Sequence, residues 1–352
     1  MTVSVSIGKL DALTNKHFVK RLEDNVFLTN IIWFYFKKRI KEAGGRDIRV
    51  PIRHSKNSTV GRWGMGGSTL DTTGQNNQTT VIFPWRGYKS AVVLNNTDIA
   101  QNTGAEQIVD LLEEEVSNAQ ESLMDNLDID TFLDGTIAGG GVVNAGNPNL
   151  GLQGLLAAIQ YSTDGNLTGG YGGITRASAT GGKNTAQVGN AFWNAGCVIA
   201  ANANTTIQFW KNSVTMDASS ILTIPKMQEL AGALPQPDLF VTSQLIYNKY
   251  HSLCTVIQRE MVDEEVGKAG FTSLQFNFKP IVVADNINDN GYLYALTMSD
   301  WDLYVLRGYN FKATPFKTPV NQDSIIKHVL FVGNPVCRRP NHQGYISGLT
   351  AA

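Results

Sequence analysis

The sequence predicts a mixed α+β fold in which an extended arm and one long helix are attached to a compact α/β domain. Three observations support this prediction: an alternating strand at Asp47–Arg53 followed by a long polar segment, a helical apolar stripe between Thr103 and Asp134, and short buried strands that alternate with helices after residue 225. The 352 residues, 42% of them hydrophobic, are enough to bury a sizeable core.

The N-terminal residues are predicted to form an arm followed by a helix. Residues 1–24 are polar and lack periodicity, so we expect them to be extended. Asn25–Ala43 contains a heavily aromatic stretch and is predicted to be a helix that ends at Gly44–Gly45, since glycine commonly terminates helices. The basic cluster Lys37–Arg39 could contact nucleic acid, but cations at the carboxyl end of a helix explain it equally well.

The next segment is predicted to be a two-stranded arm with a long tip. Asp47–Arg53 alternates apolar and polar residues, and Pro51 confines it to a sheet edge. Residues 54–78 are rich in Gly, Ser, Thr, Asn and Gln, and Thr79–Trp85 forms the second strand, followed by Ala91–Leu94. Because long loops are uncommon unless disordered or functional, the tip is either a flexible insertion or an arm that becomes ordered on a neighbouring molecule.

Thr103–Asp134 has the strongest helical pattern in the chain. Thr103 and Glu106 form a capping box, and at ~1.5 Å per residue the helix would exceed about 40 Å. Its apolar stripe consists of Ile108, Leu112, Val116, Ala119, Leu123 and Leu127. The acids on its remaining faces are Glu113, Glu114, Glu115, Glu121, Asp125 and Asp128. The helix contains no cation to pair with them, so we expect their positive partners to come from elsewhere.

The remainder of the chain is predicted to alternate helices and strands after a Gly- and Asn-rich stretch, 135–184. That stretch lacks the spacing of a phosphate-binding loop. The predicted helices are Lys226–Leu234 and a helix that begins after Ser243. The predicted strands are Leu239–Thr242, a strand within Phe276–Ala284, Tyr292–Leu296, Trp301–Leu306 and His328–Val332.

Charge is segregated along the chain although the formal net charge is −1. Residues 1–89 contain 15 Lys or Arg against 6 Asp or Glu, whereas residues 90–175 contain 12 acids and no Lys or Arg. Such segregation indicates self-complementarity between copies. The inter-subunit contact candidates are Arg49, Arg53, Lys56 and Arg62 on the arm, and Glu113, Glu114, Glu115 and Glu121 on the long helix. We expect the arm of one copy to cross the acidic helix of the next.

No catalytic, cofactor-binding or metal residue is predicted. The five histidines lack metal-ligand spacing, and the chain has neither a nucleophile elbow nor a dinucleotide fingerprint. His251 and Cys254 could share a helix face, although two ligands make no site. Three distant cysteines argue against a disulfide framework and for a reducing compartment. The most apolar window, Phe27–Phe36, is too short to span a bilayer, so we expect a soluble, intracellular product with no membrane partner.

The order of elements resembles that of the major capsid proteins of tailed bacteriophages, which share the Hong Kong-type capsid fold. Local segments resemble the family's patterns: Phe132–Gly135 with Asn147-Pro148 and Gly151–Leu155 (NPxGL), Pro237–Leu253 (hydrophobic strand, then helix), Pro280–Asp285 (GLPVVxS), and Arg338–Pro340 with Gly344–Leu349 (RRPxxFxxGxL). Two positions depart from these patterns: Phe278-Lys279 replaces the usual Gly-Leu, and His342-Gln343 interrupts the closing segment.

The resemblance implies a phage capsid fold with four parts. These are an N-terminal arm (1–45), an extended two-stranded loop (46–96), a peripheral domain on a long spine helix (97–155 and 323–352) and an axial α/β domain (156–322). It also implies a structural major capsid protein, not an enzyme, whose copies form pentamers and hexamers of an icosahedral shell. The shell would enclose double-stranded phage DNA without sequence-specific binding, and would be assembled in the host cytoplasm as part of the virion.

Partners and processing follow from the same resemblance. Members often carry a cleavable N-terminal scaffolding segment, for which the chain from Met1 has no room, so a separate scaffolding protein, a portal and an uncleaved N-terminus are expected. Two alternatives remain open. An encapsulin-like shell would share the fold but load protein cargo instead of DNA. A soluble enzyme with an unrecognised site would show a small oligomer and measurable turnover.

Overall fold

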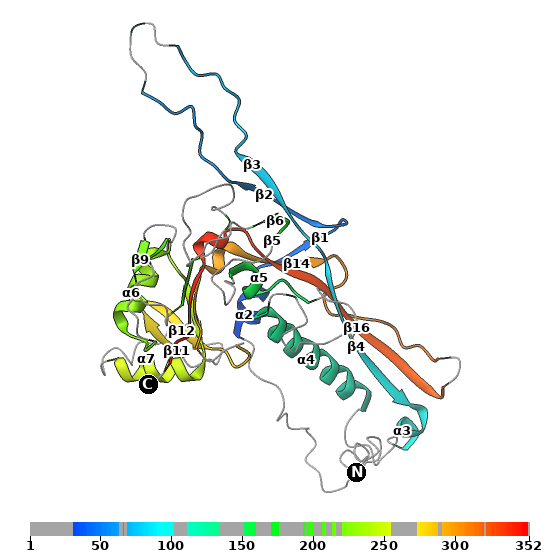
Figure 1. The fold of residues 1–352 in the computed structure, drawn as a ribbon. Helices are drawn as coiled ribbons and strands as arrows, with labels where there is room; N and C mark the ends of the chain where they lie inside the picture. The colour runs from blue at the N-terminus through cyan, green and yellow to red at the C-terminus, as the bar shows by residue number, and fades with distance from the viewer. Residues whose placement is uncertain are drawn as a thin grey trace.

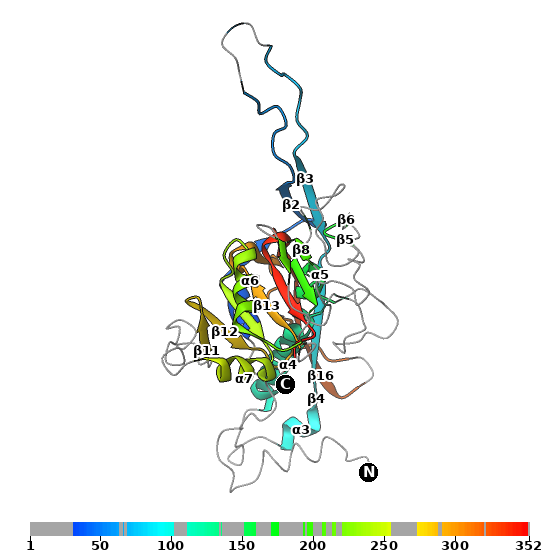
Figure 2. The same cartoon turned by 60° about the vertical axis from the view of Figure 1, so that its left-hand side comes forward.

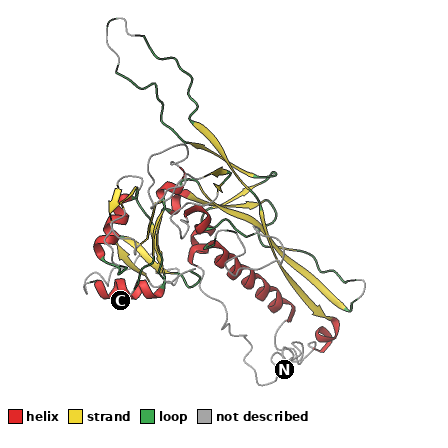
Figure 3. Cartoon of the chain, viewed as in Figure 1, coloured by secondary structure: helices red, strands yellow, loops and turns green. Residues whose placement is uncertain are grey.

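The computed structural model describes residues 31–62, 66, 69–101, 111–133, 135, 151–159, 170–175, 193, 196–199, 206–208, 213–215, 220–254, 273–287, 291–319 and 322–350. It is a mixed α/β molecule in which a narrow two-stranded arm projects from a body built on two sheets (Figure 1). Turned by 60°, the arm still extends well beyond the body (Figure 2). The distribution of helices and strands in the body is shown in Figure 3.

The first sheet has five strands and runs along one side of the body. Its members are β1 (Ile40–Ala43), β14 (Trp301–Leu306), β16 (Ser324–Cys337), β15 (Lys312–Ala313) and β4 (Arg86–Asn95). β4 pairs antiparallel with β16 along its whole length, and β1 is parallel to β14. The helices next to this sheet are α2 (Ile31–Lys37), α3 (Asn96–Gln101) and α4 (Leu111–Thr131). α4 packs against β4 and β16.

The second sheet has six strands and carries two helices on its outer face. In spatial order the strands are β11 (Ser273–Phe276), β12 (Lys279–Val283), β10 (Leu239–Thr242), β13 (Leu293–Leu296), β17 (Gly344–Ser347) and β7 (Gly196–Ile199). The two helices are α6 (Ile224–Ala233) and α7 (Gln244–Leu253). The smaller elements are α5 (Leu155–Ile159), β5 (Gly170–Tyr171), β6 (Ile174–Thr175), β8 (Thr206–Gln208), β9 (Ser213–Thr215), η4 (Met298–Asp300) and η5 (Pro340–His342).

Two apolar clusters hold the body together. The larger joins both sheets to α2 and α4, and it contains the fully buried side chains of Trp33, Trp301 and Phe331. The smaller lies between the six-stranded sheet and the helices α6 and α7, around Phe240 and Phe276. Because the larger cluster takes residues from both sheets, the packing of one sheet constrains the position of the other.

The predicted helix Asn25–Ala43 is wrong at its carboxyl end. Helix α2 ends at Lys37, and Ile40–Ala43 is strand β1, paired with β14. The pairing partner lies more than 250 residues away in the chain, so tertiary contact overrides the local helical pattern here. The amino-terminal part of the prediction, residues 25–30, lies outside the described residues.

The long helix is confirmed as α4. Its predicted first residues are not described by the structure, and one of its acidic residues is buried. Residues 102–110, which include the predicted capping box, lie outside the described residues. Ala119, Leu123 and Leu127 of the apolar stripe are buried as expected. Asp128, which was placed with the acids outside the apolar stripe, is buried as well. α4 therefore contacts the body over a wider arc than its apolar stripe.

Glycine explains how α4 ends. A Cβ added to Gly154 would lie 2.1 Å from the main-chain oxygen of Thr131, and one added to Gly135 would lie 2.9 Å from that of Leu152. The segment before α5 thus crosses the end of α4 at a distance that side chains would prevent. The helix stops at Thr131, slightly before the predicted Asp134.

The shorter strands agree closely with expectation. The predicted strands Leu239–Thr242 and Trp301–Leu306 are confirmed with the same bounds, as β10 and β14. Both sheets contain strands from each side of position 322/323, the predicted boundary between the axial domain and the last part of the peripheral domain. β14 lies before it but pairs with β16, and β17 lies after it but pairs with β13. The division into four domains stays a prediction. No helix within the described ranges is long and apolar enough to cross a membrane.

Candidate inter-subunit surfaces and the junction between the sheets

The base of the arm is held by its own chain. Strands β2 (Ile48–Arg53) and β3 (Gln78–Phe83) form an antiparallel ribbon whose inner side chains, such as Val81 and Phe83, are fully buried. The turn between β5 and β6 packs against them, and the main-chain N–H of Ile82 donates to the oxygen of Gly172 at 2.9 Å. A Cβ at Gly172 would approach the Phe83 ring to 2.7 Å.

The tip of the arm has a different character. Its described contacts are local, such as the hydrogen bond from the Ser58 hydroxyl to the Gln75 side-chain oxygen at 2.8 Å. Two apolar side chains, Val60 and Leu70, are 83% and 71% exposed. Thr73 donates both its hydroxyl and its main-chain N–H to Asp71, which lowers the pKa of that carboxyl. The tip therefore has local turn structure but no packing against the body among these residues.

The predicted basic candidates all lie on this arm. Arg49 and Arg53 point outward from β2, with Lys56 and Arg62 farther along the tip, and all four are exposed. Arg49 and Arg53 face outward because strand alternation places Ile48 and Val50 on the buried side.

The predicted acidic candidates lie on α4, away from the arm. Glu121 is exposed, Glu114 and Glu115 are partly exposed, and the side chain of Glu113 lies outside the described part of the structure. In both views the tip projects away from α4 (Figures 1 and 2). One chain therefore does not bring the two sets together, and their contact between copies stays a prediction.

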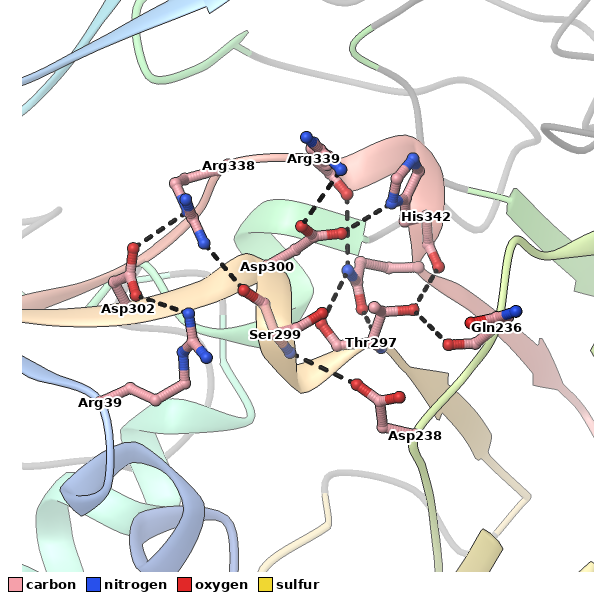
Figure 4. A network of polar contacts seen from close by, with 11 residues as sticks. Arg39, Gln236, Asp238, Thr297, Ser299, Asp300, Asp302, Arg338, Arg339 and His342 are labelled. Carbon is pink, nitrogen blue, oxygen red and sulfur yellow. Dashed lines mark hydrogen bonds and ion pairs between the residues drawn. The ribbon is translucent and has the colours of Figure 1, made fainter. Parts of the chain in front are cut away.

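A polar network that the sequence did not reveal joins the two sheets (Figure 4). Asp302 of β14 is completely buried, and three cations surround it. Lys41 Nζ lies 2.8 Å away, Arg338 Nε 3.0 Å and Arg39 Nη2 3.3 Å. Arg39 precedes β1, Lys41 lies in β1, and Arg338 follows β16. The Asp302 carboxylate therefore connects β14 to β1 and to the end of β16.

The same network continues toward the six-stranded sheet. Asp300 lies 2.7 Å from His342 Nδ1 and 3.8 Å from Arg339. The buried side chain of Gln343 accepts a hydrogen bond from the main-chain N–H of Thr297 at 2.8 Å. This contact explains one departure from the family pattern, because Gln343 satisfies buried main-chain groups at the point where β16 gives way to β17.

A second polar contact fixes the end of α4. The Tyr88 hydroxyl donates to Asp130 and accepts from the main-chain N–H of Leu152 at 2.8 Å. Burial, reinforced by the negative charge of Asp130, raises the pKa of Tyr88, and burial also raises the pKa of Asp130. The Tyr88 hydroxyl therefore keeps its proton as the donor to Asp130, and the contact holds β4, α4 and the segment before α5 together.

The residues weighed for metal or nucleophile chemistry do not converge. His251 is exposed whereas Cys254 is buried, so the two do not share one environment. Within the described ranges, no three His, Cys, Asp or Glu side chains form a group that could hold a metal ion.

No family model and no curated protein matches this sequence. Solved structures do match over nearly the whole chain. The cyanophage A-1(L) capsid asymmetric unit aligns with a TM-score of 0.67 at 15% identity, covering 99% of both chains. The capsid of a native GTA particle aligns with a TM-score of 0.58 at 9% identity, covering 99% of this chain and 100% of that one.

An encapsulin matches with the same TM-score and identity as the GTA capsid. The SrpI encapsulin of Synechococcus elongatus has a TM-score of 0.58 at 9% identity and covers 100% of this chain and 98% of that one. Identities this low establish the fold alone. The chain has the Hong Kong-type capsid fold, as the order of its elements predicted.

Proposed function

We propose that this chain is the major capsid subunit of a tailed bacteriophage and that its copies assemble into an icosahedral shell around double-stranded DNA. The observation that supports this most is the full-length likeness to the cyanophage capsid, with 99% of both chains covered. The likeness includes the whole chain, so little of it is left to form a separate catalytic domain. A structural role without enzymatic turnover follows.

The tip of the arm makes few contacts within its own chain, which suggests that it is stabilised by contacts with a neighbouring copy. A polar ribbon that exposes Val60 and Leu70 to water gains little from projecting into solvent. It would be stabilised by lying on a neighbouring copy. The arm has an excess of basic residues and α4 an excess of acids. The arm of one copy would therefore be attracted to α4 of the next.

DNA, scaffolding protein and portal belong to the same proposal. The shell would sit in the virion after assembly in the host cytoplasm and would enclose DNA without reading its sequence. A scaffolding protein encoded separately would guide assembly.

Electron microscopy of the expressed chain tests the shell. We expect closed particles when it is produced alone or with its neighbouring open reading frames. A matched variant replaces residues 57–75 by a short Gly-Ser turn. It keeps β2 and β3 and should therefore fold, as shown by an unchanged circular dichroism spectrum, yet fail to form particles. A monodisperse small oligomer under all conditions contradicts the shell.

Hydrogen exchange tests the role of the tip. Residues 54–77 should exchange rapidly in free subunits and slowly in particles, since protection follows local contacts. The base strands β2 and β3 are an internal control, because their buried residues should be protected in both states. Equal exchange of the tip in both states shows that it is merely a surface loop.

A protein-loading shell is the second candidate, favoured by the equally complete match to an encapsulin. Its contents separate the two functions. Nuclease-resistant DNA inside purified particles supports the phage capsid. A single co-purifying protein, retained after nuclease treatment and identified by mass spectrometry, supports the encapsulin-like shell.

A further inference from the structure

A buried carboxylate lies where α4 meets the six-stranded sheet. Asp128, near the end of α4, is 3% exposed, and its Oδ2 accepts a hydrogen bond from the side-chain amide of Asn286 at 3.0 Å. The same amide nitrogen lies 3.5 Å from Oδ1 of Asp125. Asn286 follows β12, so a single amide group connects two carboxylates of α4 to the second sheet.

The surroundings of Asp128 leave its charge uncompensated. Its Oδ1 is buried and has no hydrogen-bond partner among the described residues. The two charges that act on it, Asp125 from α4 and Asp285 from the segment after β12, are both negative. From α2, the group that faces it is the main chain of Trp33. Burial of an ionised carboxylate without full hydrogen bonding carries a large desolvation cost, and protonation lowers that cost because it removes the charge.

Protonation is accessible near neutral pH. Burial is the largest influence and, with the charges of Asp125 and Asp285, raises the pKa of Asp128 to about 6. The hydrogen bonds from Asn286 and the Trp33 main chain act in the opposite direction but are outweighed.

The position of this group gives its charge a structural consequence. The segment 284–287 is tied to the six-stranded sheet, since the main-chain N–H of Ala284 donates to the oxygen of Thr242 in β10 at 3.0 Å. α4 packs instead against β4 and β16 of the five-stranded sheet. A weaker contact at Asp128 therefore loosens the connection between the two sheets.

We propose that Asp128 is a proton-controlled latch between α4 and the segment 284–287. With its carboxyl protonated, repulsion among Asp125, Asp128 and Asp285 falls and the contact closes. With the carboxyl ionised, the contact opens more often. The latch belongs to the single subunit and does not depend on the proposed shell.

Hydrogen exchange of the full chain at pH 5 and pH 7.5, corrected for intrinsic exchange rates, tests the latch. If opening returns Asp128 to its ordinary pKa of 3.8, linkage makes opening about tenfold more frequent at pH 7.5 than at pH 5. We expect this tenfold change at the end of α4 and at 284–287. The variant Asp128→Asn should show the slow, closed exchange at both pH values.

Two further variants complete the test. Glu229→Gln removes an exposed acid of α6 and should keep the wild-type pH dependence. Asn286→Asp adds a carboxylate and removes the amide donor, so it should open the contact further at pH 7.5 and be rescued at pH 5. The latch is refuted if Asp128→Asn keeps the pH dependence of the wild type, or if Asn286→Asp is equally loosened at both pH values.

Discussion

Asp302 and Asp128 are both almost completely buried, yet they stand in opposite electrostatic surroundings. Asp302 lies among Arg39, Lys41 and Arg338. Asp128 has hydrogen bonds from Asn286 and the Trp33 main chain, and the charges that act on it are those of two further carboxylates. Burial alone therefore does not decide what a carboxylate contributes to this fold. The charges that share its site decide whether ionisation holds segments together or pushes them apart.

The largest expected effect comes from removing the compensated charge. Asp302→Asn should lower the free energy of unfolding by about 3 kcal/mol, because three cations lose their shared partner in a buried site. The partial exposure of those cations lets them regain water and keeps the loss at the lower end. Urea denaturation at pH 7.5 measures it.

The matched control for this variant is Asp300→Asn. Its partners are His342 and the largely exposed Arg339, so we expect a loss of about 1 kcal/mol. A loss below 1 kcal/mol for Asp302→Asn would show that the cations do not depend on that carboxylate.

Removing the charge of Asp128, which no cation compensates, should raise the free energy of unfolding instead of lowering it. The pKa of Asp128 is raised in the folded chain, so its stabilising contribution is complete below the unfolded pKa of 3.8 and is lost as pH rises through about 6. Asp128→Asn should therefore raise the free energy of unfolding by about 1–2 kcal/mol at pH 7.5, with a much smaller gain at pH 5. Urea denaturation at the two pH values measures the difference. A destabilised variant at pH 7.5 would contradict this account of Asp128.

The smallest effect of any single substitution is expected for the α4 acids, because we propose that their partners lie in another copy. Reversing Glu113, Glu114 and Glu115 to Lys should impair particle assembly, most at low salt. Each exposed pair contributes only ~0–1 kcal/mol, and salt near 0.15 M limits its range to about 8 Å. The effect should therefore appear for the group and not for single substitutions. Light scattering during assembly measures it.

The control for this contact is the compensating reversal of Arg49, Arg53 and Arg62 to Glu. In combination with the reversed helix it should partly restore assembly, which separates contact from misfolding. If the reversed helix assembles normally at low salt, or the double reversal restores nothing, the arm does not cross α4 of the next copy.

Patterns with a short period predicted much of this fold correctly. The alternation in β2, the buried runs β10 and β14 and the stripe of α4 depend on residues close together in sequence, so their physical signal is local. The strand β1 was mistaken for helix because its partner β14 lies at the other end of the chain. No local signal distinguishes Ile40–Ala43 from the last turn of a helix.

The polar sites could not be predicted from the sequence either, because their residues also lie far apart in the chain. The cluster Lys37–Arg39 was interpreted as a nucleic-acid contact or as cations at a helix end. Lys37 does lie in the last turn of α2, but Arg39 pairs with Asp302, 263 residues away. Asp128 was placed with the other acids outside the apolar stripe, and the stripe does not reveal that the segment after β12 covers the adjoining face. The acids Asp300 and Asp302 and the basic pair Arg338 and Arg339 were visible separately, but their meeting depends on the packing of both sheets.

The pairing of β4 with β16 has a mechanical consequence. Only Pro84 and Trp85 separate β3 of the arm from β4, so tension on the arm passes along the backbone into the sheet. Hydrogen bonds in an antiparallel pair lie perpendicular to the strands, and the 10 residues of β4 all pair with β16. A pull along the arm therefore loads the whole ladder in shear and cannot open it one bond at a time. The tip can yield while its attachment resists, which suits the arm to carrying load between neighbouring molecules.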